Sequence, residues 1–279
     1  MIEALAAHHL GVDKIGACVV QDQHTWTRGS FNICIPVEVK LKATTRKFMM
    51  RFPMPHKLAE ARYPGTVDEK LSCEVGTYVW MQENFPDIPI PHLVVFGYGY
   101  LTGGHGSKNL TDCDSIIPSR NVQYTYAIHR PFYIRVANIM RRRLLTFLRS
   151  PLVSRYTCNP TFNSLRTGYM IFEFIDPNRG HMLSDSWQGS QEDPIRRKNL
   201  FQGMDRLILS LARISQTRMS SFRYHSDGTI SSTNRPLSCS TIILENNGAL
   251  RIMQSNDTYT CTDAFVSDML TFHNHRFVS

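Results

Sequence analysis

One basic and one acidic residue, Arg51 and Glu74, have the types and the spacing to do chemistry together. Arg51 ends the short apolar run that begins at Phe48, and Glu74 lies in the amphipathic stretch that starts near Val67. A base on a strand and an acid on the next helix can form an ion pair that presents the base to phosphate oxygens. The same pair of residue types also occurs in many domains as a structural or solvated pair, so the surrounding elements must decide between the two interpretations.

The elements before Arg51 are expected to be two strands. Residues 31–39 alternate apolar and polar side chains, which is the period of a half-buried strand, and Pro36 marks it as an edge strand or interrupts it. Gly29 and Ser30 predict a turn at its start. Residues 48–52 predict the second strand, and together these runs indicate a small antiparallel sheet.

The element that carries Glu74 is expected to be a helix. Apolar residues recur from Val67 onward at spacings of three and four, and Thr66 or Asp68 is a plausible cap. Three prolines at positions 86, 89 and 91 end the helix. Residues 92–98 then predict another strand, so the acid lies on a helix between two strands.

The remainder of the chain alternates between periodic and irregular stretches. The patterns predict a helix over 1–22, a loop over 99–127, a basic helix over 132–149 and a buried strand over 169–175. They also predict a helix over 196–219, a hairpin over 222–232 around Asp227 and Gly228, and a helix over 262–272.

Composition limits the class of protein. Hydrophobic residues make up 42% of the 279-residue chain, which is enough to build a core. The seven cysteines are odd in number, scattered and without a CxxC pair, which argues against a disulfide framework or a zinc site. No signal peptide or membrane-spanning run is found, so we expect a cytoplasmic protein.

Several longer strings resemble the aminoglycoside phosphotransferase-like group of the protein-kinase-like fold, and most closely an uncharacterised branch of filamentous fungi. The strings that carry the likeness are RGSFNICIPVEV (28–39), RKFMMRFPMPHKLAE (46–60), EKLSCEVGTYVWMQENFPDIPIPHLVVFGYG (69–99), RPFYIRVANIMRRRLLTFLRSPLVSRY (130–156), TGYMIFEFIDPNRGHMLSDSW (167–187), LSLARI (209–214) and TNRPLSCSTIILENNGALRIMQSNDTYTCTDAFVSDMLTFHNHRF (233–277). They cover most of the chain.

The resemblance implies an α+β, kinase-like fold of two lobes. The amino-terminal lobe, with its small antiparallel sheet, would be complete over residues 1–98. Residues 99–129 would be a loop or insertion, residues 130–180 would supply the basic helix, a strand and the hinge, and residues 181–279 would form a partial, helical carboxy-terminal lobe. The family reaction is transfer of a phosphoryl group from ATP, with Mg²⁺, to a hydroxyl of a small molecule.

The resemblance also implies roles for nine residues. The turn that covers the phosphates would be Gly29, Ser30, Phe31 and Asn32. Arg51 would stand where the family has a lysine that contacts the α- and β-phosphates, and Glu74 would be the ion-pair partner of Arg51. The hinge, whose backbone meets the adenine, would be Glu173, Phe174 and Ile175. Arginine keeps the charge of lysine but changes its geometry.

One departure from the family pattern concerns the catalytic loop. The family needs an H-x-D-x-x-x-x-N loop and a later metal-binding aspartate. The only H-x-D in the chain is His225-Ser226-Asp227, but the residue five positions after Asp227 is Ser232 and Gly228 makes Asp227 a turn residue. We therefore expect a chain that is truncated before the catalytic loop, has no catalytic residues of its own and is inactive or nearly so.

The uneven charge supports a second hypothesis. No acidic residue occurs between Asp114 and Glu173, although the chain carries a net charge of +8. The stretch Arg135–Arg149 predicts a basic amphipathic helix, which could bind an anionic membrane or nucleic acid in a non-catalytic, nucleotide-binding or interaction module. The competing expectation is a solvated helix that packs its apolar face on the lobe.

Overall fold

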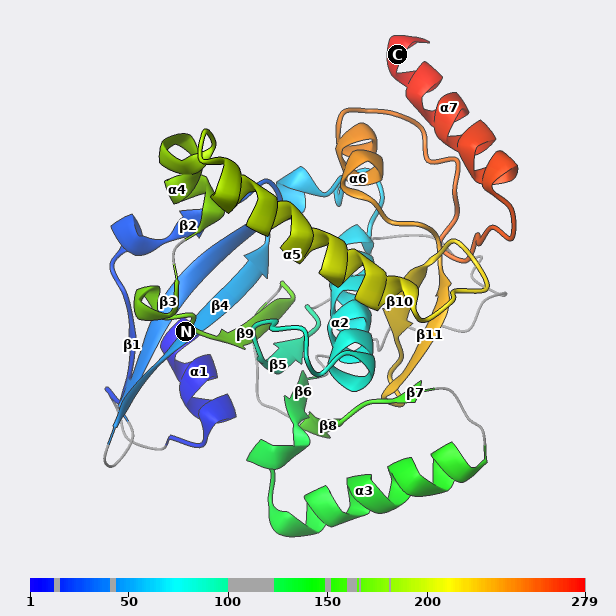
Figure 1. Ribbon diagram of the computed structural model, residues 1–279. Coiled ribbons are helices and arrows are strands. Elements are labelled where there is room, and N and C mark those ends of the chain that lie inside the picture. Colours follow the sequence, from blue (N-terminus) through cyan, green and yellow to red (C-terminus); the bar gives the residue numbers. More distant parts are fainter. Residues whose placement is uncertain are drawn as a thin grey trace.

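The computed structural model describes residues 1–12, 16–40, 44–99, 123–148, 152–159, 165, 167–180 and 182–278. Within these residues the chain is a mixed α+β protein with an eight-stranded antiparallel sheet, a separate three-stranded sheet and seven α-helices (Figure 1). The antiparallel sheet expected from the alternating strands is therefore present.

The large sheet has the strand order β1-β3-β4-β9-β5-β6-β8, with β2 paired to β3 beside this path. Its strands are β1 (Cys18–Val20), β2 (Thr27–Arg28), β3 (Asn32–Lys40), β4 (Thr45–Pro53), β5 (Leu93–Gly97), β6 (Gln123–Tyr126), β8 (Tyr156–Asn159) and β9 (Tyr169–Glu173). Strand β9 lies between β4 and β5, so a late segment of the chain completes the centre of the sheet.

Pro36 lies inside β3 and neither interrupts it nor places it at an edge. The β3–β4 register runs without a break from Asn32 opposite Pro53 to Lys40 opposite Thr45. On the other side of β3, β1 pairs with residues 37–39 and β2 with residues 33–34. Pro36 sits in the gap between these two short strands, where its missing N–H breaks no ladder hydrogen bond, and its carbonyl accepts from the Gln21 amide at 3.0 Å.

Helix α2 (Thr66–Asn84) carries Glu74 and begins with a cap that differs from the prediction. The cap residue is Gly65, whose φ of 94° is in the left-handed region that favours glycine. The first-turn amides are satisfied by Glu60, whose carboxylate oxygens accept from Gly65 N and Val67 N at 2.7 Å each. Thr66 and Asp68 are instead buried. The helix ends at Asn84, with Phe85 as its carboxy-terminal cap directly before Pro86, as expected.

The core lies on both faces of the large sheet. Alternate residues of a strand point to opposite faces, so neighbouring residues of β4 join different clusters. On one face Met50 packs with Val37, Ile171 and Leu5 of α1 (Ile2–Leu10). On the other face Leu71, Val75 and Val79 of α2 pack against Leu93, Phe96 and Met170.

The amino-terminal helix is shorter than the predicted 1–22. It ends at Leu10 because Gly11 adopts φ 66° and donates to the last carbonyls, and Cys18–Val20 forms strand β1 instead. Most of the stretch expected as a loop, residues 100–122, lies outside the described residues. Residues 123–126, expected in the same loop, form β6 and pair with β5 and β8.

A smaller unit packs on the other side of α2. Strands β10 (Ser221–Tyr224) and β11 (Thr229–Asn234) form the hairpin predicted around Asp227 and Gly228, and β7 (Leu152–Val153) adds a third strand. Gly228 has φ 81°, as a tight hairpin turn requires. Helix α6 (Cys239–Asn246), which sequence patterns did not separate from its surroundings, follows the hairpin.

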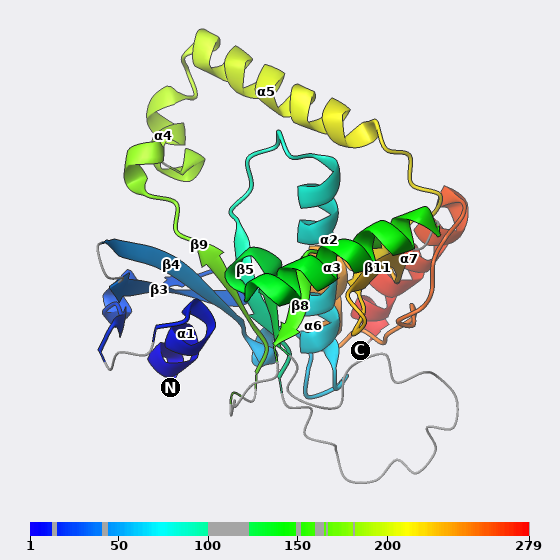
Figure 2. The ribbon, with the colours of Figure 1, turned by 90° about the horizontal axis from the view of Figure 1, so that it is seen from below.

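Four further helices lie at the periphery. They are α3 (Phe132–Phe147), α4 (Leu183–Ser190), α5 (Pro194–Ala212) and α7 (Thr262–Val278). Helix α5 ends at Ala212, before the predicted Met219, and Met219 instead forms a bridge with Tyr259. No residue of α4 or α5 is buried, and the two helices stand away from the body of the sheet (Figure 2).

Candidate functional site

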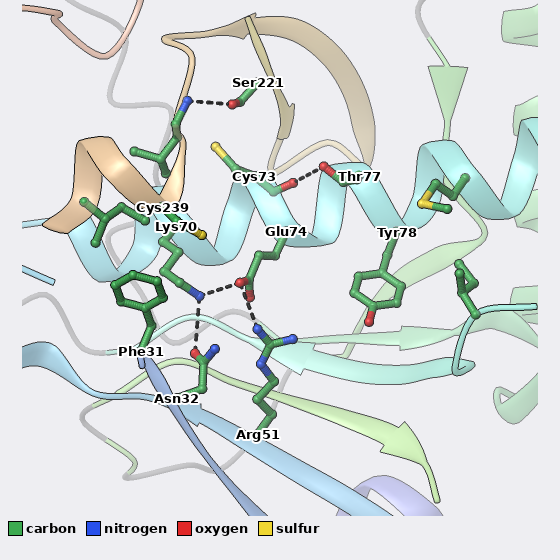
Figure 3. A pocket seen from close by; sticks show the side chains of 14 residues that line it. Phe31, Asn32, Arg51, Lys70, Cys73, Glu74, Thr77, Tyr78, Ser221 and Cys239 are labelled. Atoms are coloured by element: carbon green, nitrogen blue, oxygen red, sulfur yellow. Dashed lines mark hydrogen bonds and ion pairs between the residues drawn. The ribbon is translucent and has the colours of Figure 1, made fainter. Parts of the chain in front are cut away.

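A cavity of about 460 Å³ opens where β3 and β4 meet the polar side of α2. This volume is within the range of small-molecule sites. Side chains from the start of β3, from β4, from α2 and from the segment around α6 surround it (Figure 3). Its lining residues are Phe31, Asn32, Arg51, Lys70, Cys73, Glu74, Thr77, Tyr78, Met81, Ile90, Ser221, Leu237, Cys239 and Ile242.

Arg51 and Glu74 form an ion pair at the floor of this cavity. Arg51 Nη2 donates to Glu74 Oε1 at 3.0 Å, and a quarter of each side chain is exposed. Arg51 pairs with Cys34 of β3 and with Met170 of β9, so two neighbouring strands hold its backbone in the sheet. The pair predicted from the sequence is therefore present and joins β4 to α2.

Lys70 is a second cation in the same cavity, and sequence reasoning missed it. Its ammonium donates to Asn32 Oδ1 at 3.2 Å and also to Glu74 Oε1, one turn further along α2. Only 6% of the side chain is exposed. Burial lowers the pKa of Lys70, and the adjacent Glu74 carboxylate opposes that shift. The i, i+4 spacing of Lys70 and Glu74 was the available signal.

The balance of charge in the cavity is positive. Arg51 and Lys70 share a single carboxylate oxygen, Glu74 Oε1. Of the lining residues in the described part of the chain, Glu74 alone is acidic. Two cations and one carboxylate leave one net positive charge in a partly desolvated site, where electrostatic attraction is stronger than in water. The site is thus suited to an anion such as a phosphate group.

The structure brings together four of the nine predicted site residues. Phe31, Asn32, Arg51 and Glu74 line the cavity. Gly29 and Ser30 form the expected turn between β2 and β3, closed by the Gly29 amide donating to Asn32 O at 2.9 Å, but they do not line the cavity.

The three predicted hinge residues also lie away from the cavity. Glu173 is the last residue of β9 and pairs with Phe48, while Phe174 and Ile175 follow the strand end. Phe174 lies beneath Lys47, whose ammonium is 5.9 Å from the ring centroid. Along β9, Glu173 is three positions from Met170, the residue opposite Arg51. Three residues of extended strand correspond to about 10 Å.

The donor set does not fit a resident Mg²⁺. Magnesium in phosphoryl-transfer sites is held through one or two free carboxylates together with phosphate oxygens. Here Glu74 is engaged by both Arg51 and Lys70.

His225 and Asp227 occupy the tip of the β10–β11 hairpin, as their sequence context predicted. Asp227 Oδ1 accepts from Thr229 N at 2.9 Å and from Thr229 Oγ1 at 2.7 Å. His225 Nε2 is 2.6 Å from Ser231 Oγ. Both side chains are thus used in closing a turn, and neither lines the cavity beside Arg51.

A buried ion network holds α2 in place from its other side. Arg235, fully buried, donates from Nε to Glu69 Oε1 at 2.8 Å and also binds Glu245 of α6. Arg251 completes the network by donating to both oxygens of Glu245 at 2.9 and 2.8 Å. Because Glu69 lies one residue before Lys70, this network positions the segment of α2 that faces the cavity.

Comparison with known proteins gave no match to a family model, a curated protein or a solved structure. None of the helices in the described part of the chain is both long and apolar enough to cross a bilayer.

Proposed function

We propose that this chain is a kinase-like protein of the aminoglycoside phosphotransferase-like group, and that it binds the phosphates of ATP in the cavity between β4 and α2. In this proposal the fold has two lobes, of which the sheet with α2 is the smaller. The chain elements follow the order that the resemblance implies: a turn, a strand, a strand with a base, a helix with an acid, and a strand that leads to the hinge.

The observation that carries the proposal is the contact set around Glu74. Arg51 from β4 and Lys70 from α2 converge on one carboxylate oxygen, and Lys70 also binds Asn32 at the end of the phosphate-covering turn. A base paired with a helical glutamate is the arrangement that orients ATP phosphates in kinases. Glu74 Oε2 is buried with no hydrogen-bond partner among the described residues, so Glu74 can accept a further donor when the cations rearrange around a ligand.

The position of the hinge is compatible with a bound nucleotide. Glu173 is about 10 Å from the level of Arg51 along the adjacent strand, a distance that separates the adenine end of a nucleotide site from its phosphate end. In the proposal the backbone of Glu173, Phe174 and Ile175 meets the adenine. The turn at Gly29 and Ser30 covers the phosphates from the β2–β3 side.

We also propose that this chain by itself does not transfer the phosphoryl group. Its one H-x-D sequence forms a hairpin tip, and its Asp227 is engaged by Thr229. Among the described residues that line the cavity, Glu74 is the one carboxylate, and its ion pairs with Arg51 and Lys70 make it a poor acceptor for a hydroxyl proton and a poor metal ligand. Since positioning and charge stabilisation supply most of the catalysis in this class, loss of these groups leaves binding without turnover. The small-molecule acceptor therefore has no assigned site.

Equilibrium titration with a fluorescent ATP analogue tests the proposal. Arg51→Gln should weaken binding about 10- to 100-fold, because a charge-assisted hydrogen bond contributes roughly 1.5–3 kcal/mol. Arg46→Gln is the matched control, since Arg46 lies on the same strand, is exposed and is an odd number of residues from Arg51, on the opposite face of the sheet. The control should bind like the native chain.

Three results would contradict the proposal or a part of it. If the native chain does not bind ATP, or if Arg46→Gln weakens binding as much as Arg51→Gln, the cavity is not a nucleotide phosphate site. If the native chain hydrolyses ATP with Mg²⁺ and Arg51→Gln abolishes that turnover, the part of the proposal that denies phosphoryl transfer is wrong.

A further inference from the structure

Helix α3 presents an apolar face to solvent. We define the outer face of α3 as Phe132, Tyr133, Val136, Met140, Leu144 and Phe147, which recur every three or four residues along the helix. All six are exposed, and Phe147 and Phe132 expose 84% and 76% of their surface. The expectation that α3 packs its apolar side on the lobe is therefore wrong.

Polar contacts hold this orientation. Asn138, on the opposite side of α3, is the one residue of the helix that is buried. Arg141 donates to the Asp227 carbonyl at 2.6 Å, and Arg142 donates to Glu83 Oε2 at 2.8 Å and to the Val153 carbonyl at 3.1 Å. The surface beneath α3 thus offers carbonyl and carboxylate oxygens, which select the arginines and leave the apolar residues outside.

The charge around the outer face is positive. Arg135 lies beside it and Arg143 projects among its residues; both are exposed, and neither forms an ion pair within the described ranges. The sequence has no acidic residue between Asp114 and Glu173. An apolar stripe with aromatic residues and flanking arginines is the pattern of helices that lie in the boundary between lipid headgroups and acyl chains.

The position of α3 also suits a flat surface. Both views show it as an outermost helix, lying along one margin in Figure 1 and in front of the sheet in Figure 2. Its 16 residues correspond to a length of about 24 Å that can contact a plane at once. We propose that the outer face of α3 docks this protein on an anionic lipid bilayer. This inference is independent of the nucleotide proposal.

The same contacts argue against nucleic acid as the occupant. A nucleic-acid surface needs free cations to reach phosphates. Arg141 and Arg142, which form the basic centre of the stretch, are instead engaged by Asp227 and Glu83. The residues that remain outside are mainly apolar, which favours a lipid partner.

Co-sedimentation with phosphatidylcholine vesicles, with and without phosphatidylserine, tests the proposal. The native chain should bind the anionic vesicles and lose binding at high salt. Met140→Asp combined with Phe147→Asp should weaken binding about tenfold or more, because it removes apolar groups from the lipid boundary and adds negative charge. The matched control is Ile208→Asp combined with Leu209→Asp on α5, which also exposes both side chains. All four residues are exposed, so circular dichroism should show native folding in both variants.

Two further variants test the electrostatic contribution to membrane binding. Arg135→Gln and Arg143→Gln should each weaken binding about fivefold at low salt, since one basic residue near an anionic surface contributes roughly 1 kcal/mol. The proposal would be overturned by no binding to anionic vesicles, by an equal loss of binding in the α5 control, or by a dimer in sedimentation velocity that Met140→Asp with Phe147→Asp dissociates. Stronger binding to single-stranded RNA than to vesicles would instead assign the surface to nucleic acid and would also overturn it.

Discussion

Replacing Arg235 with methionine should destabilise the fold strongly, although Arg235 lies outside the cavity. Its side chain is fully buried and binds both carboxylates of a buried pair, with 5% of Glu69 and 1% of Glu245 exposed. Burial alone would lower the pKa of Arg235, but the hydrogen bonds to Glu69 and Glu245 raise it above its ordinary value. The guanidinium is thus held charged in the protein interior.

The size of the destabilisation follows from the hydrogen-bond donors that each carboxylate keeps after Arg235 is replaced. Without Arg235, Glu245 still binds Arg251, whereas Glu69 keeps one side-chain donor, Asn234 Nδ2 at 3.1 Å. Removing one partner of a buried ion pair costs about 3–5 kcal/mol, because a buried charge is left uncompensated. That is a large share of the roughly 5–15 kcal/mol that stabilises a typical protein.

Urea unfolding followed by circular dichroism measures this cost. Arg196→Gln is the matched control: Arg196 lies 3.4 Å from Asp193 at the surface, and its loss should change the free energy of unfolding by less than about 1 kcal/mol. Adding Glu69→Gln to Arg235→Met should recover part of the lost free energy of unfolding, since the neutral amide at position 69 replaces the buried charge of the glutamate. A cost for Arg235→Met no larger than that of Arg196→Gln would refute the reasoning.

Two further predictions concern the sheet and the base of α2. Burial raises the pKa of Asp68 to about 6, so the native state binds a proton more tightly than the unfolded state and loses about 3 kcal/mol of stability as the pH rises through that pKa. Asp68→Asn should flatten this decline in stability between about pH 4 and pH 7, measured by urea unfolding at each pH. An unchanged slope would contradict the raised pKa of Asp68. Gly97→Ala should cost about 1–3 kcal/mol, because the new methyl group would lie 2.7 Å from the Tyr169 ring. Gly189→Ala in helix α4 is the control, because nothing lies within 4 Å of the new methyl group; it should leave stability unchanged or raise it by up to about 1 kcal/mol through helix propensity. Equal effects of the two substitutions would show that the contact at Gly97 is not tight.

The strand-helix part of the site was predictable from sequence, because local patterns specify it. Apolar alternation predicted β3, a short apolar run predicted β4, and helical spacing predicted α2. The sequence thereby placed Arg51 on a strand and Glu74 on the next helix, and the structure pairs them. Lys70 was missed because its spacing to Glu74 is common on solvated helices. Its burial depends on Asn32 and on residues near α6, which are distant in sequence.

The outward orientation of α3 could not be read from its own sequence. Periodicity shows that a helix has an apolar and a basic face, but the surface beneath decides which one turns inward. Here that surface is Glu83 of α2 and the carbonyls of Val153 and Asp227, so the arginines turn inward. The insertion of β9 between β4 and β5 likewise depends on pairing between segments far apart in the chain.

The most direct test of the central claim is the affinity of the native chain and of Lys70→Met for ATP, compared with their affinity for adenosine. If Lys70 binds phosphate beside Arg51, the native chain should bind ATP more tightly than adenosine. Lys70→Met should then bind ATP about 10- to 100-fold more weakly than the native chain, with its affinity for adenosine unchanged. Equal affinities of the native chain for ATP and adenosine, or an equal loss for both ligands in the variant, would contradict a phosphate site in this cavity.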